Sequence, residues 1–255
     1  HATFFALLVG LTFLFSLLRF EGATQGYWDT YITAPAAVLS GHSVDFVLKD
    51  GRSAWHPELT GVLPHDLVDR EEFGIVTKDQ RIGAPLLAAP FFSGFGLFGM
   101  RLLFALSIAL LIPTGFLAAR SAVLHAGLKP KGWVLLAAAA LLAWNPYVLS
   151  IDRLNANVLV LSLALFLIHL LLLARQPIVL AGLLFGALAG VRNEAICFVP
   201  AITLWMLWPG ASRTLSERSL RLIQLGFWTV VAMLPVFYWK WYAFGHPLMH
   251  PSQYP

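Results

Sequence analysis

Long apolar runs alternate with short polar breaks along the chain, and one polar stretch is much longer than the rest. A helix that crosses a bilayer needs about 17–25 predominantly apolar residues, and most of the runs reach or approach that length. The pattern predicts an all-α integral membrane protein with about seven transmembrane helices. Their expected bounds are residues 2–18, 98–119, 132–149, 154–174, 177–191, 195–208 and 220–243, of which the fifth and sixth are short.

The long polar stretch covers residues 20–83 and is expected to form a loop on the outer face that contains short surface helices. Within it, Asp29, Ile32 and Ala36 lie at helical spacing, which predicts a short helix along the membrane surface. Residues 84–97 follow as an apolar piece interrupted by Pro and Gly. This composition predicts a tilted or re-entrant helix that leads into the second span.

The composition supports a membrane protein and excludes several other classes. Hydrophobic residues make up 58% of the chain and charged residues 12%, whereas soluble domains have about 45–50% and about 25%. A DNA-binding domain is excluded because 17 basic residues against 13 acidic ones is a small and scattered excess. Cys197 is the single cysteine, so the chain has no internal disulfide. We interpret residues 1–255 as one transmembrane module.

Basic residues in the short connections predict the orientation, because cytoplasmic loops carry an excess of Lys and Arg. If the first helix starts in the cytoplasm, one set falls on the cytoplasmic side without conflict: Arg120, Lys129, Lys131, Arg175, Arg213, Arg218 and Arg221. The stretch 20–83, with ten acidic and five basic residues, then falls outside. We expect a protein of the plasma or inner membrane with its functional site on the extracytoplasmic face.

Two charged turns on the outer side are candidate site elements. Arg192 and Glu194 lie between two short helices, so their turn is expected to lie below the headgroups or to face a cavity. Asp152 and Arg153 lie between the third and fourth spans. Charges near membrane depth are costly and suggest function, although all four could be ordinary turn residues at a wet interface. Arginine can bind a phosphate through two parallel hydrogen bonds, or it can form a structural ion pair with the neighbouring glutamate.

Asp29 and Lys240 each have a functional and a structural interpretation. A carboxylate beside the bilayer can act as a general base toward a sugar or protein hydroxyl, or it can simply favour the start of a helix. Lys240 can reach a lipid phosphate, although the aromatic belt around it, residues 238–244, is also typical of plain anchoring in the interface.

Four stretches, taken in order, carry a resemblance to a known superfamily. They are an acid followed by a tyrosine, a small-residue helix and Leu-x-Gly (residues 29–41), Gly-x-Pro-Leu-Leu (83–87), a glycine-containing turn with Arg-x-Glu (186–194) and Phe-Gly-x-Pro (244–247). This set resembles the GT-C superfamily of multi-span glycosyltransferases, which use polyprenyl- or dolichyl-phosphate sugars and include protein mannosyltransferases and aminoarabinose transferases. The resemblance covers nearly the whole chain.

The resemblance implies a reaction and a set of site residues. The catalytic base would be the acid of the first outer loop, which by position is Asp29, with Glu21 as second candidate. It would deprotonate an acceptor hydroxyl that attacks the sugar of a polyprenyl-phosphate donor. Arg192, with Lys240 and Arg153, would neutralise the departing lipid phosphate. Three residues would support the site: Glu194, Asp152 and His246.

The chain also departs from the family pattern. Asn193 stands where related sequences usually have Pro, Thr30 stands where many of the enzymes have a second acid, and those enzymes are much longer. We therefore expect the N-terminal part of a longer chain or a reduced homologue. The alternative function is a catalytically inactive structural subunit that has other membrane subunits as partners. A secondary transporter is less favoured because the chain lacks two similar halves.

A divalent metal is the one cofactor that the sequence leaves open. Histidines and acids occur together on the predicted outer side: His42, His56, His65, His246 and His250, with Asp45, Glu58, Asp66 and Asp69. No spacing matches a zinc or calcium motif, so no metal ligand is assigned. No glycine-rich phosphate loop occurs, so nucleotide sugars are not expected as direct donors. Gly182 and Gly186 predict close packing of two helices.

Overall fold

The described part of the chain is all α-helical, as the apolar runs predict. The computed structural model describes residues 2–19, 32, 36, 40, 83–150, 156–173, 176–207 and 214–244. The elements in chain order are α1 (Ala2–Arg19), α6 (Gly83–Ala109), α7 (Leu111–His125), α8 (Gly132–Ala143), α9 (Pro146–Ser150), α10 (Ala156–Leu172), α11 (Ile178–Val191), the 3-10 helix η2 (Asn193–Phe198), α12 (Val199–Leu207) and α13 (Leu215–Phe244). No strand occurs among these residues.

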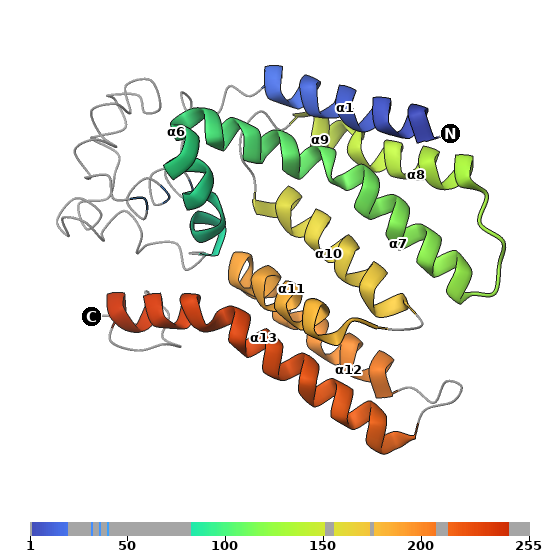
Figure 1. The fold of residues 1–255 in the computed structure, drawn as a ribbon, viewed down its shortest axis with the longest axis vertical. Coiled ribbons are helices and arrows are strands. Elements are labelled where there is room, and N and C mark those ends of the chain that lie inside the picture. Colours follow the sequence, from blue (N-terminus) through green and yellow to red (C-terminus); the bar gives the residue numbers. More distant parts are fainter. Residues whose placement is uncertain are drawn as a thin grey trace.

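The helices run back and forth between two ends of the molecule (Figure 1). One end, here called the polar end, holds the start of α6, the end of α9, the start of α10 and the end of α11. The opposite end, here called the basic end, holds the connection from α7 to α8 and the first turns of α13. Successive apolar segments therefore alternate in direction, as helices that pass through a bilayer do.

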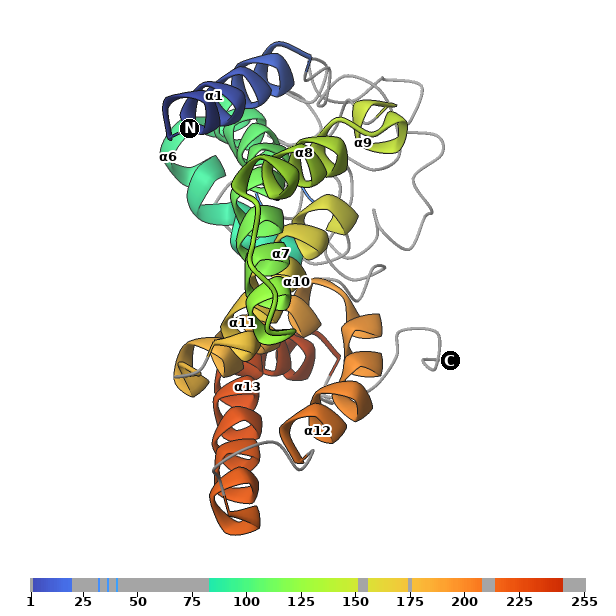
Figure 2. The same ribbon diagram turned by 90° about the vertical axis from the view of Figure 1, so that its right-hand side faces the viewer.

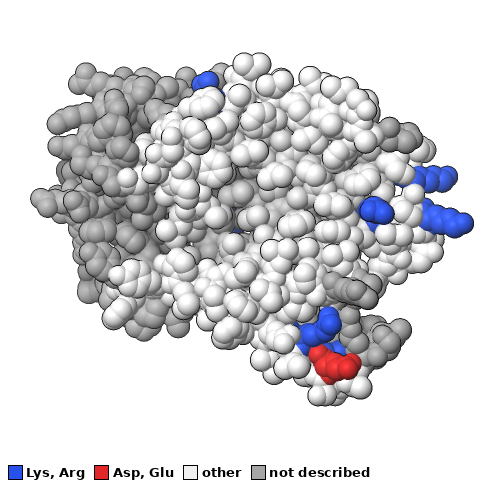
Figure 3. Space-filling view, viewed as in Figure 1, with Lys and Arg blue, Asp and Glu red and all other residues white. Residues whose placement is uncertain are grey.

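Lys and Arg gather at the basic end, and most of the face seen in Figure 3 carries no charged side chain. The described residues of this group are Arg120, Lys129, Lys131, Arg218 and Arg221, all of which the sequence predicts on one side of the membrane. Arg175 and Arg213 lie outside the described residues. The grouping agrees with the predicted topology, while the side of the membrane that each end faces stays a prediction.

Four helices are long and apolar enough to cross a membrane: Ala2–Arg19, Phe98–His125, Gly132–Ser150 and Leu215–Tyr238. Three more apolar helices are shorter: Asn157–Leu172, Ile178–Val191 and Glu194–Leu207. The 14 residues of α11 make a helix about 21 Å long, against a hydrocarbon core of about 30 Å. The expected count of about seven transmembrane helices is therefore corrected to four helices of spanning length in the described part of the chain. Apolar residues in turns raise hydropathy without adding helix length.

The Pro- and Gly-interrupted piece before the second span is helical but sharply bent. Within α6, Gly96 has φ 58° and ψ −139°, a left-handed backbone conformation that glycine adopts without steric cost. A Cβ on Gly99 would overlap the backbone of Phe91, so the two limbs of α6 approach closely around this bend. The prediction of a helix tilted against the following span is confirmed at Gly96.

Three described residues of the long polar stretch precede α6, and they pack onto the start of that helix. Ile32 and Ala36 are buried in the same apolar cluster as Ala88. The backbone N–H of Ser40 donates to the carbonyl of Ala36 at 3.0 Å, and its hydroxyl donates to the carbonyl of Ala89 at 2.9 Å. Ile32 and Ala36 are helical, in agreement with the predicted surface helix, and both side chains are buried against the bundle.

α10 joins two clusters of buried apolar side chains. Val158 and Leu159, near its start, belong to the first cluster, which also contains residues of α6, α7 and α8. Leu167 and Leu171, near its end, belong to the second, which also contains residues of α11, α12 and α13. α10 therefore holds the two halves of the molecule together, and it lies between α7 and α11 in Figure 1.

α11 and α13 are in close backbone contact at two glycines. A Cβ on Gly182 would lie 2.6 Å from the Cβ of Trp228, and one on Gly186 would lie 2.6 Å from the Cβ of Ala232. Real Cβ atoms do not approach so closely, so only glycine fits at either position. The close helix packing predicted from these glycines is confirmed.

α1 and α13 lie at opposite edges of the molecule in both views (Figures 1 and 2). Only 11% of the spanning window of each is buried, so both present apolar faces outward, as helices bordering lipid do. The buried hydroxyl of Thr12 in α1 has partners within the protein: it donates to the carbonyl of Leu8 at 2.7 Å and accepts from Nε1 of Trp144 at 2.8 Å. Such pairing is what a low-dielectric surrounding requires.

Candidate functional site

The candidate site is built where α11 stops at the polar end. Arg192 has an extended backbone (φ −141°, ψ 112°), which ends α11 and separates it from η2. The N–H of Arg192 still donates to the carbonyl of Leu188, and its carbonyl accepts from Ala195 at 3.0 Å. The break therefore keeps its backbone hydrogen bonds while directing the Arg192 side chain across the ends of neighbouring helices.

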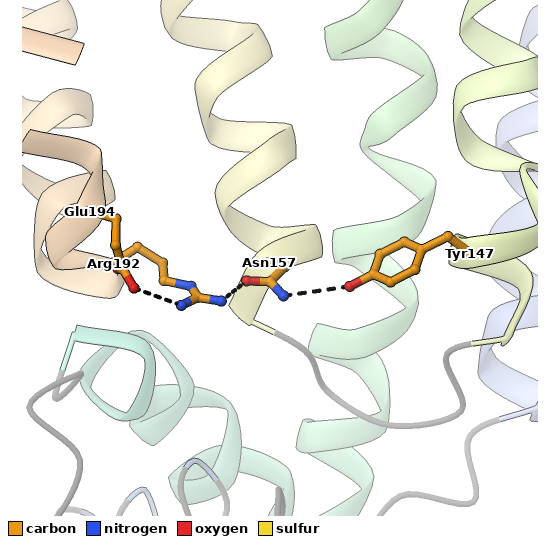
Figure 4. A network of polar contacts seen from close by, with 4 residues as sticks. All are labelled: Tyr147, Asn157, Arg192 and Glu194. Carbon is orange, nitrogen blue, oxygen red and sulfur yellow. Dashed lines mark hydrogen bonds and ion pairs between the residues drawn. The ribbon is translucent and has the colours of Figure 1, made fainter. Parts of the chain in front are cut away.

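Arg192 bridges an acid on its own segment and an amide on the next helix (Figure 4). Its Nη1 contacts Oε1 of Glu194 at 3.0 Å, and its Nη2 donates to Oδ1 of Asn157 in the first turn of α10. The amide nitrogen of Asn157 in turn lies 3.5 Å from the hydroxyl of Tyr147 in α9. Four side chains from three consecutive segments of the bundle thus form one line of polar contacts.

The two charged members of this line differ in exposure. The Arg192 side chain is 21% exposed, whereas that of Glu194 is 62% exposed. The Arg192 side chain is therefore mostly covered by protein, whereas the Glu194 side chain is mostly exposed. A guanidinium has five N–H donors in a rigid fork. Glu194 and Asn157 each contact one terminal nitrogen of Arg192, so the guanidinium retains donors that could bind a phosphate or carboxylate.

The long polar stretch rejoins the bundle directly beside this arginine. A Cβ on Gly83, the first residue of α6, would overlap the backbone of Gly190, two residues before Arg192. Val191 is fully buried in the cluster that contains Ile32 and Ala36. The C-terminal end of the outer stretch is therefore packed against the helix end that carries Arg192, and Ile32 and Ala36 belong to the same apolar cluster as Val191.

A second arginine stabilises the polar end from α1. Arg19 donates to the carbonyls of Val148, at 3.0 Å, and of Leu149 at the end of α9, and its guanidinium lies 5.3 Å from the ring centre of Phe15. A cation at the last carbonyls of a helix is favourable because those groups lack partners within the helix. The contact also fixes the position of α9, which carries Tyr147.

The structure describes only part of the site predicted from sequence. Arg192 and Glu194 are brought together as an ion pair. Lys240 lies in α13, four residues beyond Val236, which packs against Gly190; the side chain of Lys240 is outside the described residues. The other predicted site residues also lie outside them: Asp29, Glu21, Arg153, Asp152 and His246.

The sequence leaves a divalent metal open but assigns no ligand to it. Among the residues that the structure describes, no group of three or more His, Cys, Asp or Glu side chains could hold a metal ion. The outer histidines and their neighbouring acids lie outside that part of the chain. No step of the chemistry below is assigned to a metal.

Sequence reasoning missed the two uncharged partners, Asn157 and Tyr147. A signal for Asn157 is its place in the first turn of an otherwise apolar helix, where an amide is unusual unless it has a hydrogen-bond partner. Tyr147 offers no such signal, because a tyrosine near a helix end is equally typical of an interfacial anchor.

Comparison of the chain with protein-family models, curated proteins and solved structures finds no match.

Proposed function

We propose that the protein is a membrane glycosyltransferase that moves a sugar from a polyprenyl-phosphate donor to an acceptor hydroxyl on the extracytoplasmic face. Asp29 is the general base, with Glu21 as second candidate. Arg192 binds the lipid phosphate, assisted by Lys240 and Arg153. The observation that carries the proposal is the close contact of Gly83, where the acid-bearing outer stretch ends, with the helix end that presents Arg192.

The covalent chain limits how far the proposed base can lie from the nearest described residue. Ile32, buried with Val191, is three residues after Asp29 in the sequence. Since a residue of extended chain spans at most about 3.6 Å, the Cα atoms of Asp29 and Ile32 are within about 11 Å of each other. This limit on the Cα distance is compatible with a base and a phosphate-binding cation on opposite sides of a bound sugar.

The proposed transfer is a displacement at the anomeric carbon. Asp29 accepts the proton of the acceptor hydroxyl, and the oxygen forms a bond to the anomeric carbon of the sugar. The bond between that carbon and the phosphate oxygen breaks, and its electron pair leaves with the polyprenyl phosphate. Arg192 stabilises the charge on this leaving group through charge-assisted hydrogen bonds. Asn157 acts as a positioning residue by fixing the guanidinium.

The test uses the purified protein in proteoliposomes that contain radiolabelled polyprenyl-phosphate mannose or polyprenyl-phosphate aminoarabinose, with host membrane extract as acceptor. We expect label transfer by the native protein and a loss of at least 100-fold in Asp29→Asn, in line with the usual contribution of a general base. Asp79→Asn, an acid of the same stretch with no assigned role, is the matched control. Equal transfer by both variants would contradict the proposed base.

A binding measurement separates the arginine from the base. Polyprenyl phosphate without sugar is titrated onto the protein in detergent and counted by native mass spectrometry. Arg192→Gln is expected to weaken binding about tenfold or more, while Arg120→Gln at the basic end leaves it unchanged. Unchanged binding in Arg192→Gln would show that the arginine serves only its ion pair.

The alternative, an inactive structural subunit, is supported by a different observation. Five large apolar residues follow a regular 3,4 spacing on the outward face of α1: Phe4, Leu7, Leu11, Leu14 and Leu18. Such a stripe suits packing against another membrane helix as well as lipid. Constant-ratio co-purification with other membrane subunits through a mild detergent, combined with no transfer from either donor, would favour this function over the enzyme.

A further inference from the structure

An apolar groove opens between α1, α7 and α8, away from the Arg192 site. Its volume is about 640 Å³, and it is lined almost entirely by apolar atoms, with Phe5 and Phe116 on one side and Leu136 and Ala140 on the other. On α8 the groove begins at Gly132, the first residue of that helix. It therefore starts at the basic end and runs toward the middle of the bundle.

The groove has the length and direction of part of one lipid chain. Along α8 it extends from Gly132 to Ala140, which at about 1.5 Å per residue is about 12 Å. This is less than half of a hydrocarbon core of about 30 Å, so the groove lies within one leaflet. Its helices belong to segments of spanning length, so the groove faces the acyl region of a bilayer rather than water.

Positive charge stands at the mouth of the groove. Lys131 directly precedes Gly132, and Lys129 lies two residues earlier; both side chains are exposed. Basic residues next to the membrane attract the headgroups of anionic lipids. The described part of the α7–α8 connection carries no acid to offset them.

We propose that the groove holds an acyl chain of an anionic phospholipid whose headgroup phosphate contacts Lys129 and Lys131. A protein helix is a poorer match, because a groove of about 640 Å³ that extends about 12 Å along α8 is small for a helix and has two lysines next to its first residue. The site is distinct from the proposed lipid-phosphate-sugar site in ligand and in position, and it does not depend on the proposed function.

The test counts bound phospholipid by native mass spectrometry after the full chain is incubated with equal amounts of dioleoyl phosphatidylglycerol and dioleoyl phosphatidylcholine. Ala137→Phe places a ring in the groove, because Ala137 lines it. Ala138→Phe, the next residue of the same helix and also exposed, does not line the groove and is the matched control. We expect phosphatidylglycerol binding to fall at least fivefold in Ala137→Phe only.

Lys129→Gln combined with Lys131→Gln separates the headgroup from the chain. This variant should lose the preference for phosphatidylglycerol over phosphatidylcholine while it still binds one phospholipid. Helical circular dichroism and a single gel-filtration peak confirm folding of every variant. The proposal is overturned if Ala137→Phe binds as much phosphatidylglycerol as Ala138→Phe, or if the native chain shows no preference for the anionic lipid.

Discussion

At the scale of single residues, the polar end is organised by how the charge of Arg192 is balanced. Glu194 supplies one negative charge from an exposed position, and Asn157 supplies a neutral acceptor on the other side of the guanidinium. A second carboxylate in place of the amide would give the cluster a net negative charge. The present arrangement keeps the arginine fixed without saturating it with anions, which is what a phosphate-binding group needs.

Two substitutions of nearly unchanged shape test this charge balance. Glu194→Gln leaves the arginine uncompensated and should strengthen polyprenyl phosphate binding, whereas Asn157→Asp adds a negative charge and should weaken it. Each substitution changes the net charge of the cluster by one unit, a few ångströms from the bound phosphate. Near a hydrated surface such a charge changes the binding free energy by about 1 kcal/mol, which is about a fivefold change in Kd. Titration of polyprenyl phosphate at low salt measures both. Shifts of the same sign in the two variants would rule out an electrostatic role for the cluster.

At the scale of elements, the sequence predicts the helices better than it predicts their contacts. The apolar runs locate α1, α8 and α13, and the Pro and Gly residues before the second span locate the bend at Gly96. These features follow from local chemistry, namely hydropathy and glycine conformational freedom. The partnership of Arg192 with Asn157 joins residues 35 positions apart, and local patterns do not encode such a contact.

The α11–α13 contact gives an element-scale prediction with an internal control. Gly186→Ala forces a Cβ into Ala232 and the backbone of Thr229, so it should destabilise the protein by about 1–3 kcal/mol through overpacking. Gly226→Ala, within α13, meets nothing within 4 Å and should be neutral or stabilising by up to about 1 kcal/mol. Unfolding in detergent followed by circular dichroism compares the two. Equal stability of the variants would contradict the close helix contact.

At the scale of the whole molecule, two clusters share α10, and the charged residues are sorted to the ends. The sequence anticipates the sorting, because basic connections mark one side of a membrane protein. It also anticipates that the two segments on either side of Arg192 are short, but not that the helix Asn157–Leu172 is shorter than a span as well. Hydropathy measures how apolar a segment is, whereas helix length is set by where the backbone breaks, as it does at Arg192.

The whole-molecule arrangement predicts which connections a reagent outside the cell can reach. In a Cys197→Ser background, single cysteines replace Glu194 at the polar end, Lys129 at the basic end, and Gln176 between α10 and α11. A membrane-impermeant maleimide applied to intact cells should label the variant Glu194→Cys, because the positive-inside rule predicts that the basic end faces the cytoplasm. Lys129→Cys and Gln176→Cys should react only after permeabilisation. The variant Gln176→Cys tests whether the short helices cross the membrane. If it reacts from outside together with Glu194→Cys, then α10 does not cross the membrane. The alternating path of the helices in Figure 1 would then not describe the chain in a bilayer.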